Sequence, residues 1–433
     1  MSNQSTAQAN GVAGGPQYNR TRLFITSCLS LVTTSMVFAI RGDVEGQMSQ
    51  VFHLTKAQIG AIWSPAFWAF TIAIFISGAI VDLIGMRSLH ALSSVGYIVG
   101  LLMVIFAPHP TGPVASIFGE TGTLVLFIGF MIMGLSQGLV EGVINPLIAS
   151  IYNENKTQKL NMLHAWWPGG MIVGGLLAYA LTQFGVGWQI KLGCIMIPAI
   201  IYLFLALTQT YPQTERVVSN VSTKDMWREA LQPLFLLLFV CMWMTAATEL
   251  GPDQWFPSIM KTLTGIDGIL FLVYTAGLMF VLRTFAGPLI HKISPPGMLI
   301  MCSVISAIGL FWLGSLHEGT SVIVAFAAAT VFGFGKTFFW PTMLGVTAER
   351  FPRGGALTIS LMGGTGMLSV AAALPVMGGI FDKLGPGAAL QRVAIMPVIL
   401  TFIFGGLYFY FQSQGGYKPI HLATEEPIAT GEM

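Results

Sequence analysis

Long runs of apolar residues follow one another along most of the chain, beginning with Leu23–Ile40. Each run has about 20 residues or more, the length at which an α-helix crosses a ~30 Å hydrocarbon layer. The ten-residue alternating segments that are typical of membrane β-barrels do not occur. The pattern therefore predicts an all-α integral membrane protein. We expect twelve transmembrane helices near residues 23–49, 58–82, 88–107, 121–151, 159–184, 188–209, 231–260, 266–290, 297–316, 319–350, 355–381 and 390–413.

The composition agrees with a chain whose surroundings are lipid. Of its 433 residues 54% are hydrophobic and 9% are charged, whereas soluble domains have about 25% charged residues. The net charge of +2 is no basis for binding nucleic acid. The four cysteines lie in apolar runs without metal-ligand spacing, so we expect packing roles, no metal site and no cofactor. Residues 1–19 are polar and have no apolar core, which predicts a disordered tail and no cleaved signal peptide.

The placement of lysine and arginine predicts which side of the membrane each connection faces, because cytoplasmic loops are enriched in both. With both termini cytoplasmic, the cytoplasmic segments hold Arg20, Arg22, Arg87, Lys156, Lys159, Arg216, Lys224, Arg228, Lys292, Arg350, Arg353 and Lys418. The outer segments hold Lys56, Lys191, Lys261, Lys383 and Arg392. This bias favours cytoplasmic termini, in agreement with an even number of spans.

The longest polar connection divides the chain into two halves that resemble each other. We predict an N-terminal tail (1–22), a six-helix bundle (23–210), a cytoplasmic linker (211–229), a second six-helix bundle (230–413) and a C-terminal tail (414–433). The stretch "GVINPLIASIYNEN" of the fourth span matches "TFFWPTMLGVTAER" of the tenth, so that Pro146 aligns with Pro341 and Glu141 with Lys336. Repeated halves are typical of secondary transporters, which bind substrate between them near the midplane.

A short cluster of glycines and charges ends the second span. In "GAIVDLIGMR", the residues Gly78, Asp82, Gly85 and Arg87 resemble the loop motif of the major facilitator superfamily, although Leu83 stands where that motif has a basic residue. The resemblance implies that the glycines allow close packing and that the charged residues latch neighbouring helix ends. The alternative is an ordinary charged turn between two helices.

Ionisable residues interrupt the apolar runs at a few positions. They are Arg41, Asp43, Glu45, Glu141, Glu249, Asp253, Arg283 and Lys336. A charge at the bilayer centre costs about 2.5–3.5 kcal/mol on insertion scales, so such residues face the bundle interior or a wet cavity. A carboxylate in a site of low polarity binds a proton more tightly than one in water. We therefore interpret Glu141 as a proton-carrying or coupling group. A permanent Glu141–Lys336 ion pair is the alternative, and Glu45 could simply pair with Arg41.

Three stretches carry a more specific resemblance. "EGVINP" in the fourth span followed by "LNMLHAWWPGG", together with "RGDVEGQ" and "TELGPDQW", is similar to the fucose–galactose–glucose:proton symporter family of the major facilitator superfamily. The resemblance implies that spans one, four, seven and ten line a central cavity. It also implies that Asp43 and Glu141 are the essential carboxylates. Arg41, Lys336 and the run Trp166–Pro168 depart from the best-known member of that family, which leaves the particular sugar open. The family also has sodium-driven members, so the coupling ion is open between proton and sodium.

Neutral polar residues and tryptophans near these charges suit a hydroxyl-rich substrate. Amides and imidazoles both donate and accept hydrogen bonds, as sugar hydroxyls require, and indole rings can stack on the apolar face of a sugar. The candidate substrate-binding residues are Gln47, Gln137, Asn145, Asn161, His164, Trp166, Glu249, Asp253, Gln254, Trp255, Lys336 and Trp340. His164 is equally compatible with a structural role. Tryptophans also gather at membrane interfaces, where we place Trp188, Trp227 and Trp312.

These features predict a proton-coupled sugar symporter that works by alternating access as a monomer in a bacterial inner membrane. An organic-anion or drug transporter of the same superfamily is the alternative, since Arg41, Arg283 and Lys336 could bind an anion. An enzyme is not expected, because the chain has no HExxH, GxSxG or phosphate-binding motif and no catalytic constellation. A membrane scaffold or receptor is a further alternative.

Overall fold

A computed structural model describes residues 18–152, 159, 162–212, 222–284 and 293–420. Several predicted features lie outside the described residues. They are the N-terminal tail up to residue 17, Asn161, most of the linker, the end of the eighth span and the last residues of the chain. All regular elements within the described ranges are helical, as the hydrophobic pattern predicted.

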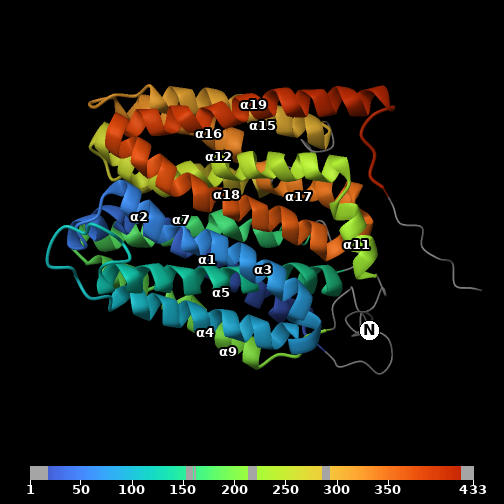
Figure 1. The fold of residues 1–433 in the computed structure, drawn as a ribbon, viewed down its shortest axis with the longest axis horizontal. Coiled ribbons are helices and arrows are strands. Elements are labelled where there is room, and N and C mark those ends of the chain that lie inside the picture. Colours follow the sequence, from blue (N-terminus) through green and yellow to red (C-terminus); the bar gives the residue numbers. More distant parts are fainter. Residues whose placement is uncertain (1–17, 153–158, 160–161, 213–221, 285–292, 421–433) are drawn as a thin grey trace, which may run out of the picture.

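The helices run back and forth between two ends of the molecule (Figure 1). We call the end that holds α11 and both ends of the described chain the linker face, and the other end the opposite face. The first group of helices is α1 (Arg20–Val51), α2 (Lys56–Trp63), α3 (Pro65–Ile84), α4 (Met86–Ile105), α5 (Thr121–Ile151), α7 (Trp166–Gln183), α8 (Trp188–Gly193) and α9 (Met196–Leu207). The second is α12 (Pro233–Thr264), α13 (Ile269–Thr284), α15 (Pro295–Gly314), α16 (Val322–Lys336), α17 (Phe339–Arg350), α18 (Gly355–Leu384) and α19 (Pro386–Ser413), preceded by α11 (Thr223–Ala230). A 3₁₀ turn, η2 (Pro352–Gly354), joins α17 to α18.

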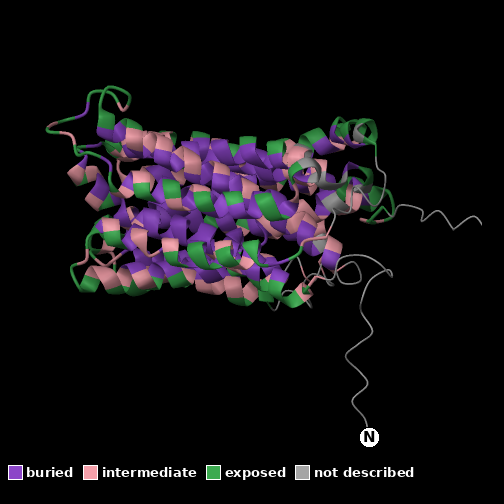
Figure 2. Cartoon of the chain, turned by 90° about the horizontal axis from the view of Figure 1, so that it is seen from below, coloured by how far each residue is buried: buried purple, intermediate pink, exposed green. Residues whose placement is uncertain are grey.

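Ten stretches of the described helices are long and apolar enough to cross a membrane by length and composition. The predicted fifth and eighth spans correspond to α7 and α13, which are not among these ten stretches. Of α13, 16 residues are described. Many large apolar side chains are exposed. The buried residues lie mostly between the helices and the exposed ones on the outside and at the ends (Figure 2). The all-α membrane architecture is confirmed in this coarser form, and twelve spans, the termini's side and the domain boundaries stay predictions.

Several predicted spans are broken rather than continuous helices. The second divides at Ser64 before Pro65, and the tenth divides at Thr337 and Phe338, between α16 and α17. Proline lacks the backbone N–H that a helix interior needs, which explains the break at Pro65. A break inside a membrane-spanning segment is tolerated where the freed backbone groups find partners in the protein.

The two groups of helices meet closely between the middle of the molecule and the opposite face. The Thr71 hydroxyl of α3 donates to the carbonyl of Gly364 in α18 at 2.5 Å. Nearer the opposite face, the Asp382 carboxylate of α18 accepts from the backbone N–H groups of Lys56 and Ala57 at 3.3 and 3.0 Å. A carboxylate at a helix N-terminus satisfies free N–H groups and interacts favourably with the helix dipole. This contact therefore holds the N-terminus of α2 against α18.

Glycine permits the close approach of these helices. A Cβ added to Gly60 of α2 would lie 2.8 Å from the Leu374 carbonyl oxygen of α18. Gly46, on α1, has no atom within 4 Å of the corresponding position. The two glycines are both helical, but only the first lies in the contact between the groups.

We predict that Gly60→Ala lowers the free energy of unfolding by about 1–3 kcal/mol, because the added methyl group overpacks the contact and displaces backbone. The thermal unfolding midpoint of the purified protein should fall accordingly. The matched control Gly46→Ala should be neutral or stabilise by about 0.5–1 kcal/mol, since alanine is the better helix former. Equal midpoints for the two variants would contradict the close packing of α2 against α18.

Candidate functional site

Two of the predicted charges of α1 form ion pairs near the opposite face. Asp43 Oδ2 lies 2.8 Å from the Nζ atom of Lys191, whose side chain is 1% exposed. Glu45 lies 2.6 Å from the Nζ atom of Lys56, which also donates to the Ser258 hydroxyl of the second group at 3.1 Å. The suggested Glu45–Arg41 pair is therefore wrong, because Lys56 takes the carboxylate. Asp43, one of the two predicted coupling acids with Glu141, therefore already has a cationic partner in this structure.

The second group compensates its own charges. On α12, Asp253 lies 2.5 Å from Lys336 Nζ of α16, with both side chains at most 1% exposed. One helical turn away, Glu249 lies 3.2 Å from Arg283 Nη2 of α13. The alternative of a Glu141–Lys336 pair is wrong, because Lys336 is already bound to Asp253. These four residues form two acid–base pairs, as buried charges require.

The Glu249–Arg283 pair also stabilises the break in the tenth span. Arg283 Nε donates to the Thr337 carbonyl at 2.9 Å, and the Trp340 backbone N–H donates to Glu249 Oε2 at 3.3 Å. The break frees these backbone groups, and a buried, unpaired backbone group costs about as much as a lost hydrogen bond. The two charged side chains thus hold α16 and α17 in a broken conformation, and the indole of Trp340 is half-buried beside it.

Glu141 of α5 differs from these acids in having amide and imidazole neighbours. Its carboxylate Oε2 accepts from Asn145 Nδ2 at 2.9 Å, and Asn145 Oδ1 lies 3.0 Å from His164 Nε2. Within the described residues, no lysine or arginine lies within ion-pair distance of this carboxylate, which is 9% exposed. Gln137 lies one turn earlier on α5, 5% exposed, with its Nε2 atom unpaired. The predicted residues Glu141, Asn145 and His164 therefore form one polar cluster, and Gln137 lies one turn away on the same helix.

Arg41 is a buried base held by neutral groups. Its guanidinium, 1% exposed, lies 4.8–5.5 Å from the ring centroids of Phe38, Trp63 and Phe67. Its Nε and Nη2 atoms donate to Gln254 Oε1 of α12 at 2.8 and 2.5 Å. No carboxylate of the described chain lies within ion-pair distance of it. An aromatic cage and one amide oxygen replace the anion that a buried guanidinium normally takes.

The remaining predicted site residues are spread over the molecule. Trp255 is fully buried against Trp63, with ring centroids 6.0 Å apart, so it packs the contact between the groups in this structure. Trp166, at the start of α7, is 43% exposed. Gln47 lies away from Glu141, in a pocket at the opposite face. Asn161 lies outside the described residues.

The glycine and charge cluster after the second span is a tight connection between α3 and α4. Gly85 adopts φ 86°, a conformation that favours glycine. The Arg87 guanidinium donates to the carbonyl of Leu207, the last residue of α9. Arg87 therefore binds a neighbouring helix end, where a cation is favourable. Gly78 and Asp82 lie in α3, but their side chains are outside the described part of the structure.

Lys56 and Lys191 were not predicted as site residues, because both fall in outer connections of the sequence. Each lies within a few residues of a predicted span end. The two acids of α1, Asp43 and Glu45, could have pointed to these lysines, because buried carboxylates need cationic partners. Trp63 and Phe67 were not predicted either, because they lie in an ordinary apolar run and have no signal of their own in the sequence.

We predict that Lys336→Met lowers stability by about 3–5 kcal/mol, because it leaves Asp253 as an unpaired buried charge. The double variant Asp253→Asn with Lys336→Met should recover most of the loss. The exposed pair of Lys261 and Asp267, 3.8 Å apart, supplies the control, since Lys261→Met should change the unfolding midpoint little. Additive losses in the double variant, measured by thermal unfolding, would contradict a coupled Asp253–Lys336 pair.

The family profile described as Major Facilitator Superfamily matches residues 23–354. A Protein TsgA homolog of Buchnera aphidicola subsp. Acyrthosiphon pisum (strain Tuc7) is 23% identical over 252 residues, 58% of this chain and 60% of that protein. The match thus covers less than two thirds of that relative's length.

Solved structures show the same fold at low sequence identity. The xylose transporter XylE from E. coli, in a partially occluded inward open conformation, superimposes with a TM-score of 0.75 at 14% identity over 90% of this chain and 99% of that chain. The nucleoside transporter NupG has a TM-score of 0.67 at 14% identity over 90% and 99% of the two chains.

Proposed function

This chain belongs to the major facilitator superfamily and is a multi-pass membrane transporter, not an enzyme, and from that premise we propose that it is a proton-coupled symporter of a neutral sugar. The superfamily predicted from the sequence motifs is thereby confirmed. Symport, the sugar, the proton and an inner-membrane location belong to the proposal. XylE, a sugar transporter by its name, supports a sugar, whereas NupG shows that the same fold serves other substrates.

One observation carries the proposal, namely the carboxylate of Glu141, which has no basic partner among the described residues. The acids Asp43, Glu45, Glu249 and Asp253 each have one. The described contacts of Glu141 lead only to Asn145 and, through it, to His164. A carboxylate without a counter-charge changes its protonation readily when its access to water changes. Loss of water around the carboxylate would therefore favour uptake of a proton, and its return on the other side of the membrane would favour release of that proton.

The neutral groups around Glu141 suit a polyol. Gln137 has an unpaired amide nitrogen, and the Asn145 amide and His164 imidazole lie next to the carboxylate. Such groups donate and accept hydrogen bonds without requiring a charge on the substrate. Trp166, 43% exposed two residues after His164, offers an accessible indole face. We propose that these residues bind the sugar and that protonation of Glu141 is coupled to its binding.

The proposal also orients the chain and its halves. We propose that α1–α9 and α12–α19 are the two moving halves, that the linker face is cytoplasmic, and that the opposite face is closed by the contacts of Asp382 and Thr71. Alternating access then requires these contacts to break while new ones form at the linker face.

We predict that Glu141→Gln abolishes sugar accumulation driven by a pH gradient in proteoliposomes, because an amide carries no proton. Exchange of labelled for unlabelled sugar across the membrane should persist, since it needs no net proton movement. Glu120→Gln is the matched control, an exposed carboxylate next to the first residue of the same helix. Undiminished gradient-driven accumulation by Glu141→Gln would refute the coupling role.

A second candidate, transport of an organic anion, has its own observation in Arg41. Of the three bases considered for anion binding, Arg283 and Lys336 are paired with acids, and Arg41 is held by a neutral amide. An incoming carboxylate could replace the Gln254 oxygen when the two groups separate. This candidate requires a sugar acid or similar anion to bind better than the neutral sugar.

We predict that Arg41→Gln leaves the affinity for neutral sugars within a few-fold of wild type if the sugar proposal holds. If the substrate is an anion, the same variant should weaken its binding by about tenfold or more, since a hydrogen bond to a charged group contributes about 1.5–3 kcal/mol. Titration calorimetry with L-fucose, D-glucose and D-glucuronate separates the two cases.

A further inference from the structure

A pocket of about 340 Å³ opens at the opposite face, on the side of the molecule where the two groups of helices are in contact. It lies between the C-terminal end of α1 and the turn that joins α7 to α8. Polar side chains of Gln47, Gln50, Thr182 and Gln189 line it, together with Trp188 and the glycine-containing turn 185–187. Its volume lies at the lower end of the range found for small-molecule sites, about 300–1,000 Å³.

Buried polar atoms in the lining lack partners within the described part of the chain. Trp188 is 3% exposed, and its Nε1 atom has no hydrogen-bond partner there. Its indole packs against Phe52 with ring centroids 5.9 Å apart, and its place at a membrane interface stays a prediction. The Oε1 atom of Gln47 is also buried without a partner. These two atoms are enclosed in this conformation, so the groups that a molecule in the pocket would meet are the other polar atoms of its lining.

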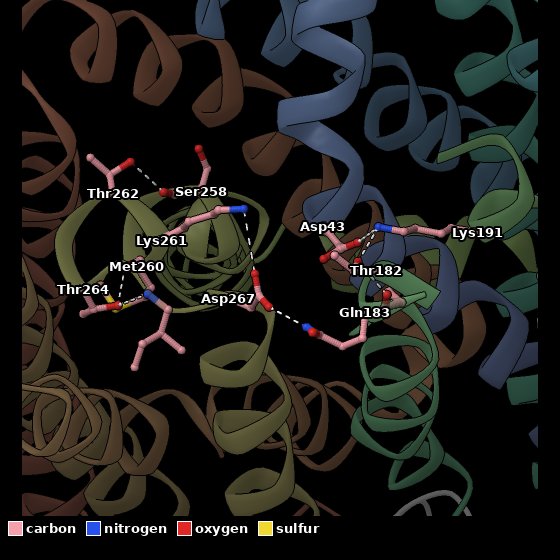
Figure 3. A network of polar contacts seen from close by, with 12 residues as sticks. Asp43, Thr182, Gln183, Lys191, Ser258, Met260, Lys261, Thr262, Thr264 and Asp267 are labelled. Atoms are coloured by element: carbon pink, nitrogen blue, oxygen red, sulfur yellow. Dashed lines mark hydrogen bonds and ion pairs between the residues drawn. The ribbon is translucent and has the colours of Figure 1, made fainter. Parts of the chain in front are cut away.

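The described residues that line the pocket are all uncharged. The nearby charges of Asp43 and Lys191 neutralise each other, and Lys191 Nζ donates at 2.6 Å to the hydroxyl of Thr182 (Figure 3). An ionic ligand would therefore meet no counter-charge from this lining. A hydroxyl group, by contrast, can both donate to and accept from the amides of Gln50 and Gln189 and the hydroxyl of Thr182.

The pocket adjoins the contact between the two groups of helices. The residue that follows Thr182, Gln183, donates to Asp267 of the second group at 2.9 Å, and Asp267 lies 3.8 Å from Lys261 (Figure 3). One short segment of α7 therefore forms both the pocket wall and part of the closed face. A ligand bound here would lie next to the contact between the two groups of helices that closes the opposite face.

We propose that this pocket is a second binding site, a vestibule for a neutral polyhydroxyl molecule such as a monosaccharide, separate from the polar cluster around Glu141. The choice of a sugar as ligand rests on the proposed function, whereas the pocket's polar, uncharged lining does not. Gln47 contributes to this site and not to the central cluster, which explains its distance from the other predicted substrate-binding residues.

Cysteine labelling of the full-length protein in nanodiscs tests the proposal. Gln50 is exposed at the pocket, so Gln50→Cys in a Cys194→Ser background should react with a maleimide. L-fucose, D-galactose and D-glucose are the probes. At a concentration well above Kd we expect at least one of them to slow labelling about fivefold or more, since occupancy follows mass action. Thr262→Cys, exposed on the same face outside the pocket, should react at an unchanged rate.

Two further variants, each combined with Gln50→Cys, separate direct occupancy from a conformational effect. Gln47→Ala should remove the protection of the introduced thiol, and Asn145→Ala, which alters only the central cluster, should leave it intact. Loss of protection in Asn145→Ala would overturn the proposal, because the signal would then come from the central site. Absence of protection in a protein that still accumulates sugar would overturn the vestibule and leave the proposed function standing. Absence of both protection and accumulation would overturn the two together.

Discussion

The structure depends on one constraint, that an ionised group enclosed by apolar helices must find a partner within the protein. Water at the surface of a soluble protein would satisfy such a group, but an apolar interior cannot. Buried acids and bases of this chain accordingly form pairs, Asp43 with Lys191, Glu45 with Lys56, Glu249 with Arg283 and Asp253 with Lys336. Each pair joins residues from different segments of the chain, so charge compensation also determines which helices lie together.

Glu141 and Arg41 are exceptions to this constraint in the described part of the chain, and they lie on different helices of the first group. Glu141 has an amide as its polar neighbour, and Arg41 has an amide oxygen and three aromatic rings. A paired charge stabilises one arrangement of helices, whereas an uncompensated charge responds to a proton or a ligand. The functional hypotheses therefore concentrate on these two positions, and the four pairs provide the rigid frame around them.

The broken tenth span shows how a charge pair can serve backbone and site together. Arg283 and Glu249 bind the carbonyl and N–H groups that the break releases, and the same break places Lys336 and Trp340 at the two helix ends. On the opposite face, Asp382 satisfies the N-terminus of α2 in the same manner. The first set of contacts lies within the second group of helices, whereas the contact of Asp382 joins the two groups.

The amino-acid sequence by itself determined the all-α membrane character, the superfamily and the spans that carry the buried charges. These properties follow from hydrophobic run length and from residues close together in the chain, such as Gln137, Glu141 and Asn145, which share one helix face at a spacing of four. Only the tertiary structure decided which charges are paired. Lys191 lies 148 positions from Asp43, and Arg41 lies 213 positions from Gln254. Several acids and bases of equal charge were available, and the strength of their attraction depends on the distance between them. Helix packing sets those distances and therefore decides which residues pair. The pocket around Gln47 and Trp188 likewise exists only because the ends of three helices meet.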